Sequence, residues 1–389
     1  MDKSTKIIIW IVVIALAIWG ILSFSKKAPV STSGGSIKIG QMSGLTGIGS
    51  DIGVEERNGA LLAVEEINAR GGIAGRAIDL VSEDSPALDL KQGVSVATKL
   101  MTINNVLAIV GPQWDGQAEV VASVSGQEKV PVISPNASTD IETKINSPYF
   151  FTTWPKNEVG IRELLKFAKE RGWKKIAIIE PANFSFWAYT ASLFEKNAPE
   201  FGIEIVSKEM GTDYTVVDYR TLIAKAKSKN PDAIFGSYAE LECVFLRQSR
   251  ELGLAIPLLS TESAGTPKAL VDCPTLLEDR LYFATPAQGN GYDKFAEAYE
   301  SRFEKKPLSP SAVTAHNAIL VLSDVIGNLV KSDKEISREN IRIGLDSVKF
   351  ENGVSMPVIE FDEKGFVITS PEAFEMQTVR DGQFVKLEN

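Results

Sequence analysis

From residue 37 onward, short runs of apolar and β-branched residues alternate with longer stretches whose apolar positions repeat every three to four residues. The short runs are typical of buried strands and the longer repeats of amphipathic helices. The predicted strands are 37–42, 78–84, 106–111, 130–134, 175–180, 203–210, 233–238, 257–261 and 280–285. The predicted helices include 53–69, 91–101, 157–171, 218–229 and 240–252. This alternation indicates α/β architecture with parallel sheets covered on both faces.

The alternation runs through two successive sets of strands, and it is interrupted at 149–156, where prolines flank an aromatic stretch. Two doubly wound sheets are therefore expected rather than one very wide sheet. Ligands of such sheets bind beyond the carboxyl ends of the strands. Two sheets that face each other would form a cleft suited to closure around a ligand.

The first 27 residues have a different pattern. Lys3 and Lys6 precede an apolar run at 7–22, and the uncharged span 7–25 is nineteen residues long. A basic start followed by an apolar run is typical of an export signal, and this span just suffices to cross a bilayer as a helix. We expect a retained membrane anchor, with a cleaved signal as the alternative. Residues 28–35 are expected to form a flexible linker to an extracytoplasmic globular part.

The composition argues against several classes of function. The 389 residues suffice for two domains, and the net charge of −9 argues against nucleic acid as a partner. The single histidine, His316, lies in an apolar-rich segment and is expected to be structural, which disfavours histidine triads and His-rich zinc sites. The sequence also lacks a phosphate loop, a nucleophile elbow and a metal-ligand cluster. We therefore expect neither an enzyme nor a cofactor.

Two cysteines, Cys243 and Cys273, are thirty residues apart. Outside the cytoplasm they could form one disulfide bridge that constrains the unfolded chain. Two separately buried thiols are the alternative, and the spacing does not decide between them.

Several motifs together resemble the leucine/isoleucine/valine-binding protein family, the substrate receptors of branched-chain amino-acid ABC transporters. They are Ile39-Gly-Gln-Met-Ser-Gly-Leu-Thr-Gly47, Asn58-Gly-Ala60, Ala63-Val-Glu-Glu-Ile-Asn-Ala-Arg-Gly-Gly-Ile-Ala-Gly-Arg76, Val106-Leu-Ala-Ile-Val-Gly-Pro112 and Val132-Ile-Ser-Pro-Asn-Ala-Ser138. The resemblance extends from residue 36 to the C-terminus. It implies the type I periplasmic-binding-protein fold, in which three crossovers join two lobes.

We expect these crossovers at 153–157, 285–288 and 352–356. The predicted N-terminal lobe then combines 36–153 with 288–352, and the C-terminal lobe combines 154–287 with 353–389.

The resemblance also implies where the ligand is held. Helix starts near Asn136, Ala137 and Ser138 would offer backbone N–H groups, and Ser138 a hydroxyl, to a carboxylate. The C-terminal lobe would contribute Tyr238, Glu262 and the aromatic ring of Phe184. Glu262 could close onto an ammonium group through a charge-assisted hydrogen bond.

Some positions depart from the family's pattern. Asp115 stands where a serine usually grips the carboxylate, and Lys156 stands near the first crossover, where an acid is common. Trp114 and Trp154 could make the pocket more aromatic. Asp115 could simply cap its helix, or the ligand could be cationic or differently oriented, with aromatic faces supporting the cation.

The sequence thus predicts an extracytoplasmic receptor that closes around a small amino-acid-like ligand and delivers it to ABC transporter permease subunits. A ligand-sensing receptor that signals through a separate membrane partner is the alternative. Leucine itself is not assigned as the ligand.

Overall fold

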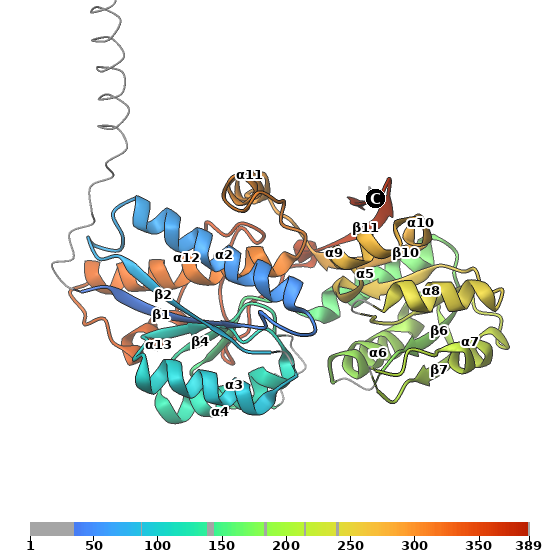
Figure 1. The fold of residues 1–389 in the computed structure, drawn as a ribbon, viewed down its shortest axis with the longest axis horizontal. Helices are drawn as coiled ribbons and strands as arrows, with labels where there is room; N and C mark the ends of the chain where they lie inside the picture. Colours follow the sequence, from blue (N-terminus) through green and yellow to red (C-terminus); the bar gives the residue numbers. More distant parts are fainter. Residues whose placement is uncertain are drawn as a thin grey trace, which may run out of the picture.

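A computed structural model describes residues 35–86, 88–137, 144–182, 185–213, 215–238 and 241–387. The chain forms two α/β lobes side by side (Figure 1). The predicted anchor at 1–27 lies outside the described residues.

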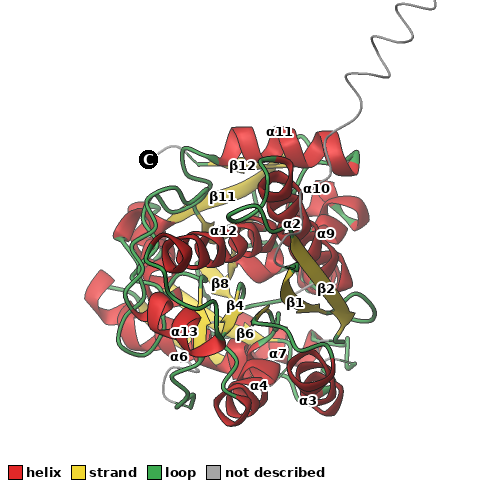
Figure 2. Cartoon of the chain, turned by 90° about the vertical axis from the view of Figure 1, so that its left-hand side faces the viewer, coloured by secondary structure: helices red, strands yellow, loops and turns green. Residues whose placement is uncertain are grey.

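The first lobe is built on a parallel sheet in the order β2-β1-β3-β4-β5. Its strands are β1 (Ile37–Ser43), β2 (Ile78–Asp84), β3 (Ala108–Val110), β4 (Val132–Ser134) and β5 (Phe150–Thr152). One face packs against α2 (Ser50–Ala69), α12 (Pro310–Lys331) and α13 (Arg338–Asp346). The other face packs against α3 (Leu90–Thr98), which continues as a short π-helix (Lys99–Ile103), and α4 (Asp115–Glu128). Figure 2 shows α2 and α12 on one side of β1 and β2, and α3 and α4 on the other.

The second lobe contains a sheet in the order β12-β11-β10-β9-β8-β6-β7. Its strands are β6 (Lys175–Glu180), β7 (Glu204–Met210), β8 (Ala233–Phe235), β9 (Leu258–Thr261), β10 (Leu281–Pro286), β11 (Phe374–Arg380) and β12 (Gln383–Lys386). The strands β6 to β10 are parallel, whereas β11 and β12 add to the edge in antiparallel fashion. The prediction of two doubly wound parallel sheets is therefore confirmed, except that two antiparallel strands extend one edge of the second sheet.

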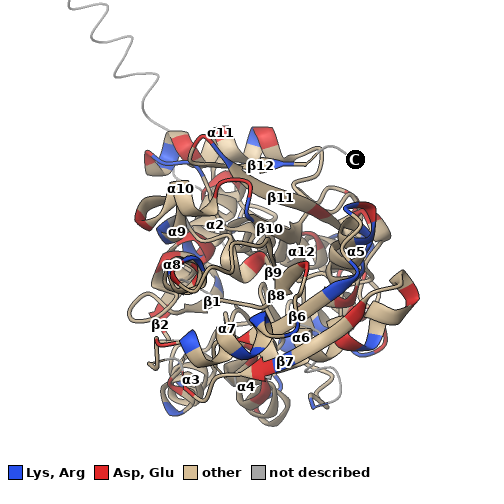
Figure 3. Cartoon of the chain, turned by 90° about the vertical axis from the view of Figure 1, so that its right-hand side faces the viewer, with Lys and Arg blue, Asp and Glu red and all other residues tan. Residues whose placement is uncertain are grey.

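Helices cover both faces of this second sheet. One face packs against α5 (Asn157–Glu170) and α6 (Ser185–Asn197). The other face packs against α7 (Arg220–Lys227), α8 (Glu242–Glu251), α9 (Pro267–Asp272) and α10 (Pro274–Leu277). In Figure 3, acidic and basic residues are interspersed over the outer helices of this lobe. Such mixing is typical of a solvated surface rather than of a basic footprint for nucleic acid.

The chain passes between the lobes three times. The first passage links β5 to α5, and the second links β10 to α11 (Tyr292–Phe303), which packs on α2. The third passage differs from the sequence-based expectation at 352–356. Residues 353–367 stay on the first lobe, because Ile359 and Val367 are buried in its core and Phe366 forms a bridge with Thr152 of β5. The chain leaves this lobe only between Val367 and β11.

Cys243 and Cys273 form a disulfide bridge across thirty residues. The bridge joins α8 to the junction between α9 and α10, on one face of the second sheet. Both residues are buried within the core there. The structure thus decides between the two alternatives in favour of the bridge.

Among the described residues, one helix is long and apolar enough to cross a membrane by length and composition. It is α12, and 67% of its apolar window is buried inside the first lobe, so it is a core helix. His316 lies in it, 3% exposed, with its ring against Phe295 and Nε2 3.5 Å from the Glu66 carboxylate. This location agrees with a structural role for the single histidine.

The contact between α2 and α12 gives a test of the first-lobe core. A Cβ atom at Gly59 of α2 would lie 1.9 Å from the carbonyl oxygen of Ala312, so Gly59→Ala must push the two helices apart. We expect it to lower the free energy of unfolding by about 1–3 kcal/mol. The control is Gly327→Ala in α12, where a Cβ meets nothing within 4 Å. Urea denaturation should show that this control is stabilised by up to about 1 kcal/mol. Equal effects at the two glycines would contradict the packing described here.

Candidate ligand-binding cleft

A cavity of about 290 Å³, here called the cleft cavity, lies between the lobes. The first lobe lines it with Ile52, Leu88, Leu90, Gln113, Trp114, Asp115, Gly116, Asn136 and the start of α12 at Ser309, Pro310 and Ser311. Trp154, at the first passage, also lines it. The second lobe adds Phe186, Trp187, Glu262, Ser263 and Gly265. The cavity therefore has one wall from each lobe, as a site that closes around a ligand requires.

The chain turns sharply where β3 ends, and this turn places Trp114 and Asp115 in the cavity wall. Gly111 has a φ of 124°, and a Cβ there would lie 2.2 Å from the Met42 carbonyl oxygen, so only glycine fits. Trp114 is the residue before α4, and Asp115 is the first residue of the helix. Asp115 is 7% exposed. Its carboxylate thus lies at the positive end of the α4 dipole, within the first turn rather than at the capping position.

Gln113 fixes the neighbouring loop of the first lobe. Its Oε1 accepts a hydrogen bond from the Gly44 N–H at 3.0 Å, and its Nε2 donates to the Gly49 carbonyl at 3.1 Å. The Trp114 indole packs against Gly49, where a Cβ would lie 2.7 Å from the ring. These contacts hold the tryptophan in one place.

A second hydrogen-bonded turn follows β4. The Ser134 hydroxyl donates to the Pro112 carbonyl at 2.7 Å and accepts from the Ala137 N–H at 2.9 Å. Thr152 Oγ1 donates to the Ala137 carbonyl at 2.9 Å, which ties the turn to β5. Asn136 lines the cavity, while Ala137 is fully buried beside it.

Glu262 follows β9 at the start of a short 3₁₀ helix (Glu262–Ala264). Its side chain is partly exposed to the cavity, yet burial of the carboxyl group among protein atoms raises its pKa to about 8. The negative charge of Asp115, across the cavity, makes a smaller contribution to the same rise in pKa. Both lobes therefore bring an acidic group to the same space.

Three further aromatic rings contribute to the wall. Trp154 is 1% exposed, and its indole N–H donates to Asn157 Oδ1 at 3.2 Å, which fixes the ring. Trp187 of α6 is equally buried, and Phe186 is half-buried beside it. With Trp114 they give the cavity a mainly apolar, aromatic lining.

Residues 36–383 match the model of a family described as periplasmic binding protein. The chain belongs to this family. More specifically, it is a type I periplasmic binding protein of the leucine/isoleucine/valine-binding group.

Curated relatives of this binding protein carry names from the same group. A leucine-, isoleucine-, valine-, threonine- and alanine-binding protein of Pseudomonas aeruginosa is 27% identical over 355 residues, which cover 90% of this chain and 91% of the relative. Leu/Ile/Val-binding protein homolog 8 of Brucella abortus is 28% identical over 298 residues, 72% and 73% of the two chains.

Solved structures share the fold. The branched-chain amino acid transporter substrate-binding protein LivJ of Streptococcus pneumoniae, in complex with isoleucine, superposes with a TM-score of 0.78 at 24% identity, covering 90% of this chain and all of that one. A Rhodopseudomonas palustris solute-binding protein in complex with benzoate superposes with a TM-score of 0.75 at 19% identity. The superposition covers 90% of this chain and 95% of that one. One fold thus holds quite different ligands, so the ligand of this binding protein must be argued from its own cleft.

The structure brings five of the predicted site residues to the cleft cavity: Trp114, Asp115, Asn136, Trp154 and Glu262. Ser138 and Phe184 lie outside the described residues. Tyr238 is placed elsewhere, since it is fully buried in the second-lobe core with its hydroxyl donating to the Ile179 carbonyl at 2.7 Å. Lys156 forms an ion pair with Asp362 at 3.2 Å and does not line the cavity.

The aromatic wall from α6 was not predicted from the sequence. Phe186 and Trp187 follow the end of β6 by only a few residues, and an aromatic cluster just beyond a strand's carboxyl end was the available signal. The start of α12 was missed as well, because it lies far away in the sequence and its Ser-Pro-Ser pattern resembles an ordinary helix start.

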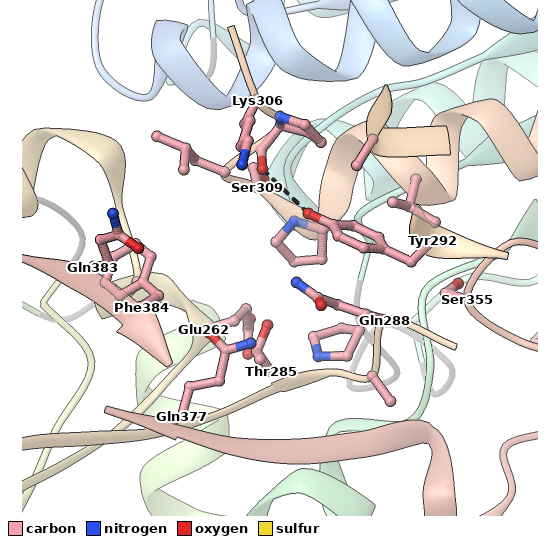
Figure 4. Close-up of a pocket in the computed structure, with 18 of the residues that line it drawn as sticks. Glu262, Thr285, Gln288, Tyr292, Lys306, Ser309, Ser355, Gln377, Gln383 and Phe384 are labelled. Atoms are coloured by element: carbon pink, nitrogen blue, oxygen red, sulfur yellow. Dashed lines mark hydrogen bonds between the residues drawn. The ribbon is translucent and has the colours of Figure 1, made fainter. Parts of the chain in front are cut away.

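A second, wider cavity of about 650 Å³ shares Glu262 with the cleft cavity (Figure 4). Its wall includes Thr285, Gln288, Tyr292 and Gln377, and the Tyr292 hydroxyl donates to the Pro307 carbonyl at 3.3 Å. Within the described ranges, no group of three or more His, Cys, Asp or Glu residues is arranged to hold a metal ion.

Proposed function

We propose that this binding protein is the extracytoplasmic substrate-binding component of an ABC transporter and captures a small amino-acid-like ligand by closure of its two lobes. The observation that carries this proposal is the cleft cavity, whose wall is divided between the lobes. The names of the relatives support it at the level of the family. Because the family consists of solute-binding proteins, we infer that the chain delivers its ligand to permease subunits and does not transform it.

Contacts between the ligand and both walls, made when the lobes close, would supply the binding energy. Trp114, Asp115 and Asn136 belong to one wall, and Trp187 and Glu262 to the other. A ligand that touches both walls stabilises the closed arrangement, because those contacts exist together only when the lobes are close. The lobes already approach each other where α4 comes close to α6.

Thermal-shift screening tests this function. The full-length chain in mild detergent is heated with amino acids, amino-acid amides, amines and aromatic acids. A ligand present at one hundred times its Kd should stabilise the folded state by about 2.7 kcal/mol and raise the melting temperature. The absence of a shift with every class would contradict the proposal.

We also propose that residues 7–25 keep the protein on the membrane, because this uncharged apolar span is just long enough for a helix to cross the bilayer. Extraction of membranes with alkaline carbonate should leave the protein in the pellet. A variant that begins at Ser36 behind a cleavable export signal should be released into the soluble fraction. Release of the native protein by carbonate would show that the segment does not anchor it.

A further inference from the structure

We infer that the cleft cavity selects a ligand with a net positive charge, an amine or quaternary ammonium compound without a carboxylate, over a zwitterionic α-amino acid. This inference rests on the proposed function and specifies the ligand class for the same cleft. Three features carry it: the acidic side chains of the cavity wall, the position of Asp115 at the start of α4, and the aromatic lining.

Every ionisable side chain among the described residues of the wall is acidic. Asp115 and Glu262 line the cavity from opposite lobes, and among the described lining residues none is Lys, Arg or His. The internal segments outside the described ranges, at 87, 138–143, 183–184, 214 and 239–240, contain no Lys, Arg or His in their sequence either. A cationic ligand would therefore supply the positive charge that this wall lacks.

Asp115 occupies the place where a carboxylate would otherwise be held. The N-terminal turn of a helix attracts anions through its unpaired N–H groups and its dipole. In α4 the first residue of that turn is itself an acid, 7% exposed and facing the cavity. A ligand carboxylate at this helix end would meet a like charge. On the neighbouring turn, the Ala137 N–H already donates to Ser134 Oγ.

The aromatic wall suits a cation as well. Trp114, Trp154, Phe186 and Trp187 all line the cavity. The faces of aromatic rings attract ammonium groups, most strongly when the site excludes water. Their apolar surface would also cover the hydrocarbon part of an amine. Two acids and four aromatic rings around about 290 Å³ thus match a small organic cation.

A matched ligand series tests the charge preference. Isothermal titration calorimetry at pH 7 compares leucine, 3-methylbutylamine and 4-methylpentanoate, then phenylalanine, 2-phenylethylamine and 3-phenylpropanoate, with choline as a quaternary cation. The full-length chain is used in mild detergent. We expect at least one amine or choline to bind at least tenfold more tightly than leucine and phenylalanine, and the two carboxylates to give no binding.

Variants test whether the preference for amines arises from the acidic residues of the cleft. Asp115→Asn and Glu262→Gln should each weaken amine binding by about tenfold to a hundredfold, because each removes one charge-assisted contact. Asp115→Asn should also reduce the difference in affinity between the amine and the corresponding amino acid. The control is Glu119→Gln, which removes the same charge from the same helix at a site paired with Lys144 and outside the cavity. It should bind the amine as the native chain does, and circular dichroism confirms that each variant is folded.

The outcomes separate the two proposals. Tighter binding of leucine, phenylalanine or a carboxylate would overturn the inference and leave the binding function standing. Amine binding that is equally weakened in Glu119→Gln, or unchanged in both Asp115→Asn and Glu262→Gln, would overturn it too. Absence of binding by every compound in this series and in the thermal-shift screen would contradict the binding function itself, and the inference with it.

Discussion

Binding of 2-phenylethylamine is expected to tighten about tenfold for each pH unit between pH 6 and pH 8, and to level off above that range. Burial and the charge of Asp115 raise the pKa of Glu262 to about 8, so the free protein carries a protonated Glu262 below that pH. A bound cation favours the ionised form, and binding must then release a proton. Affinity therefore rises with pH until Glu262 is ionised in the free protein. The amine keeps its charge throughout, since alkyl amines titrate near pH 10.

Calorimetry in buffers of different ionisation enthalpy measures both the affinity and the proton release. Glu262→Gln should bind more weakly above pH 8 and lose most of the pH dependence. Among the described residues that line the two cavities, the other ionisable side chains are Asp115 in the cleft cavity and Asp293, Glu297, Glu300, Lys306 and Tyr292 in the wider one. A native protein with constant affinity from pH 6 to 8 would show that the Glu262 carboxyl does not pair with the cation.

Removal of the disulfide bridge is expected to lower the free energy of unfolding by about 3.5 kcal/mol. Cys243 and Cys273 close a loop of about thirty residues, and a cross-link of that length restricts the unfolded chain by roughly this amount. The variant Cys243→Ser/Cys273→Ser should therefore unfold at a clearly lower urea concentration than the oxidised native protein.

Dithiothreitol provides the internal control. It should lower the denaturation midpoint of the native protein toward that of the double variant and leave the variant itself unchanged. Equal midpoints for the oxidised native protein and the double variant would contradict a stabilising role of the bridge.

Most of the fold was predictable because parallel α/β repeats leave a strong periodic signal. The strand at Ile78–Asp84 has the predicted bounds, and the helix at Asn157–Glu170 ends within one residue of its prediction. The strand Phe150–Thr152 was missed, because it has only three residues and lies close to prolines that suggested a break. The antiparallel strands β11 and β12 were missed because β11 joins the sheet by pairing with β10, which is distant in the sequence, and β12 joins it only through β11.

The third passage between the lobes was misplaced for a related reason. The crossover was expected at 352–356, and the chain does turn at 354–357. The turn, however, leads back through the pairs Phe350–Ile359 and Phe361–Val367, whose apolar side chains belong to the first-lobe core. The packing of these side chains against the first-lobe core involves residues far away in the sequence, so the local sequence does not predict it.

Most of the predicted residues that line the cavity follow a strand that could be recognised from the sequence. Trp114, Asp115 and Glu262 come directly after predicted strands, and all three line the cavity. Tyr238 also follows a strand, but its hydroxyl donates to the Ile179 carbonyl and its ring packs 4.4 Å from Phe245, which directs it into the core. The direction of a side chain at a strand end depends on its partners, and sequence position alone does not supply it.

Closure of the two lobes around a ligand is the central claim, and a distance across the cleft tests it most directly. Spin labels at Lys91→Cys on the first lobe and Ser192→Cys on the second occupy exposed positions. Pulsed electron paramagnetic resonance of the full-length chain should give a shorter and narrower distance distribution with saturating 2-phenylethylamine than without it. Unchanged distributions, with binding verified by calorimetry on the same labelled protein, would contradict the account.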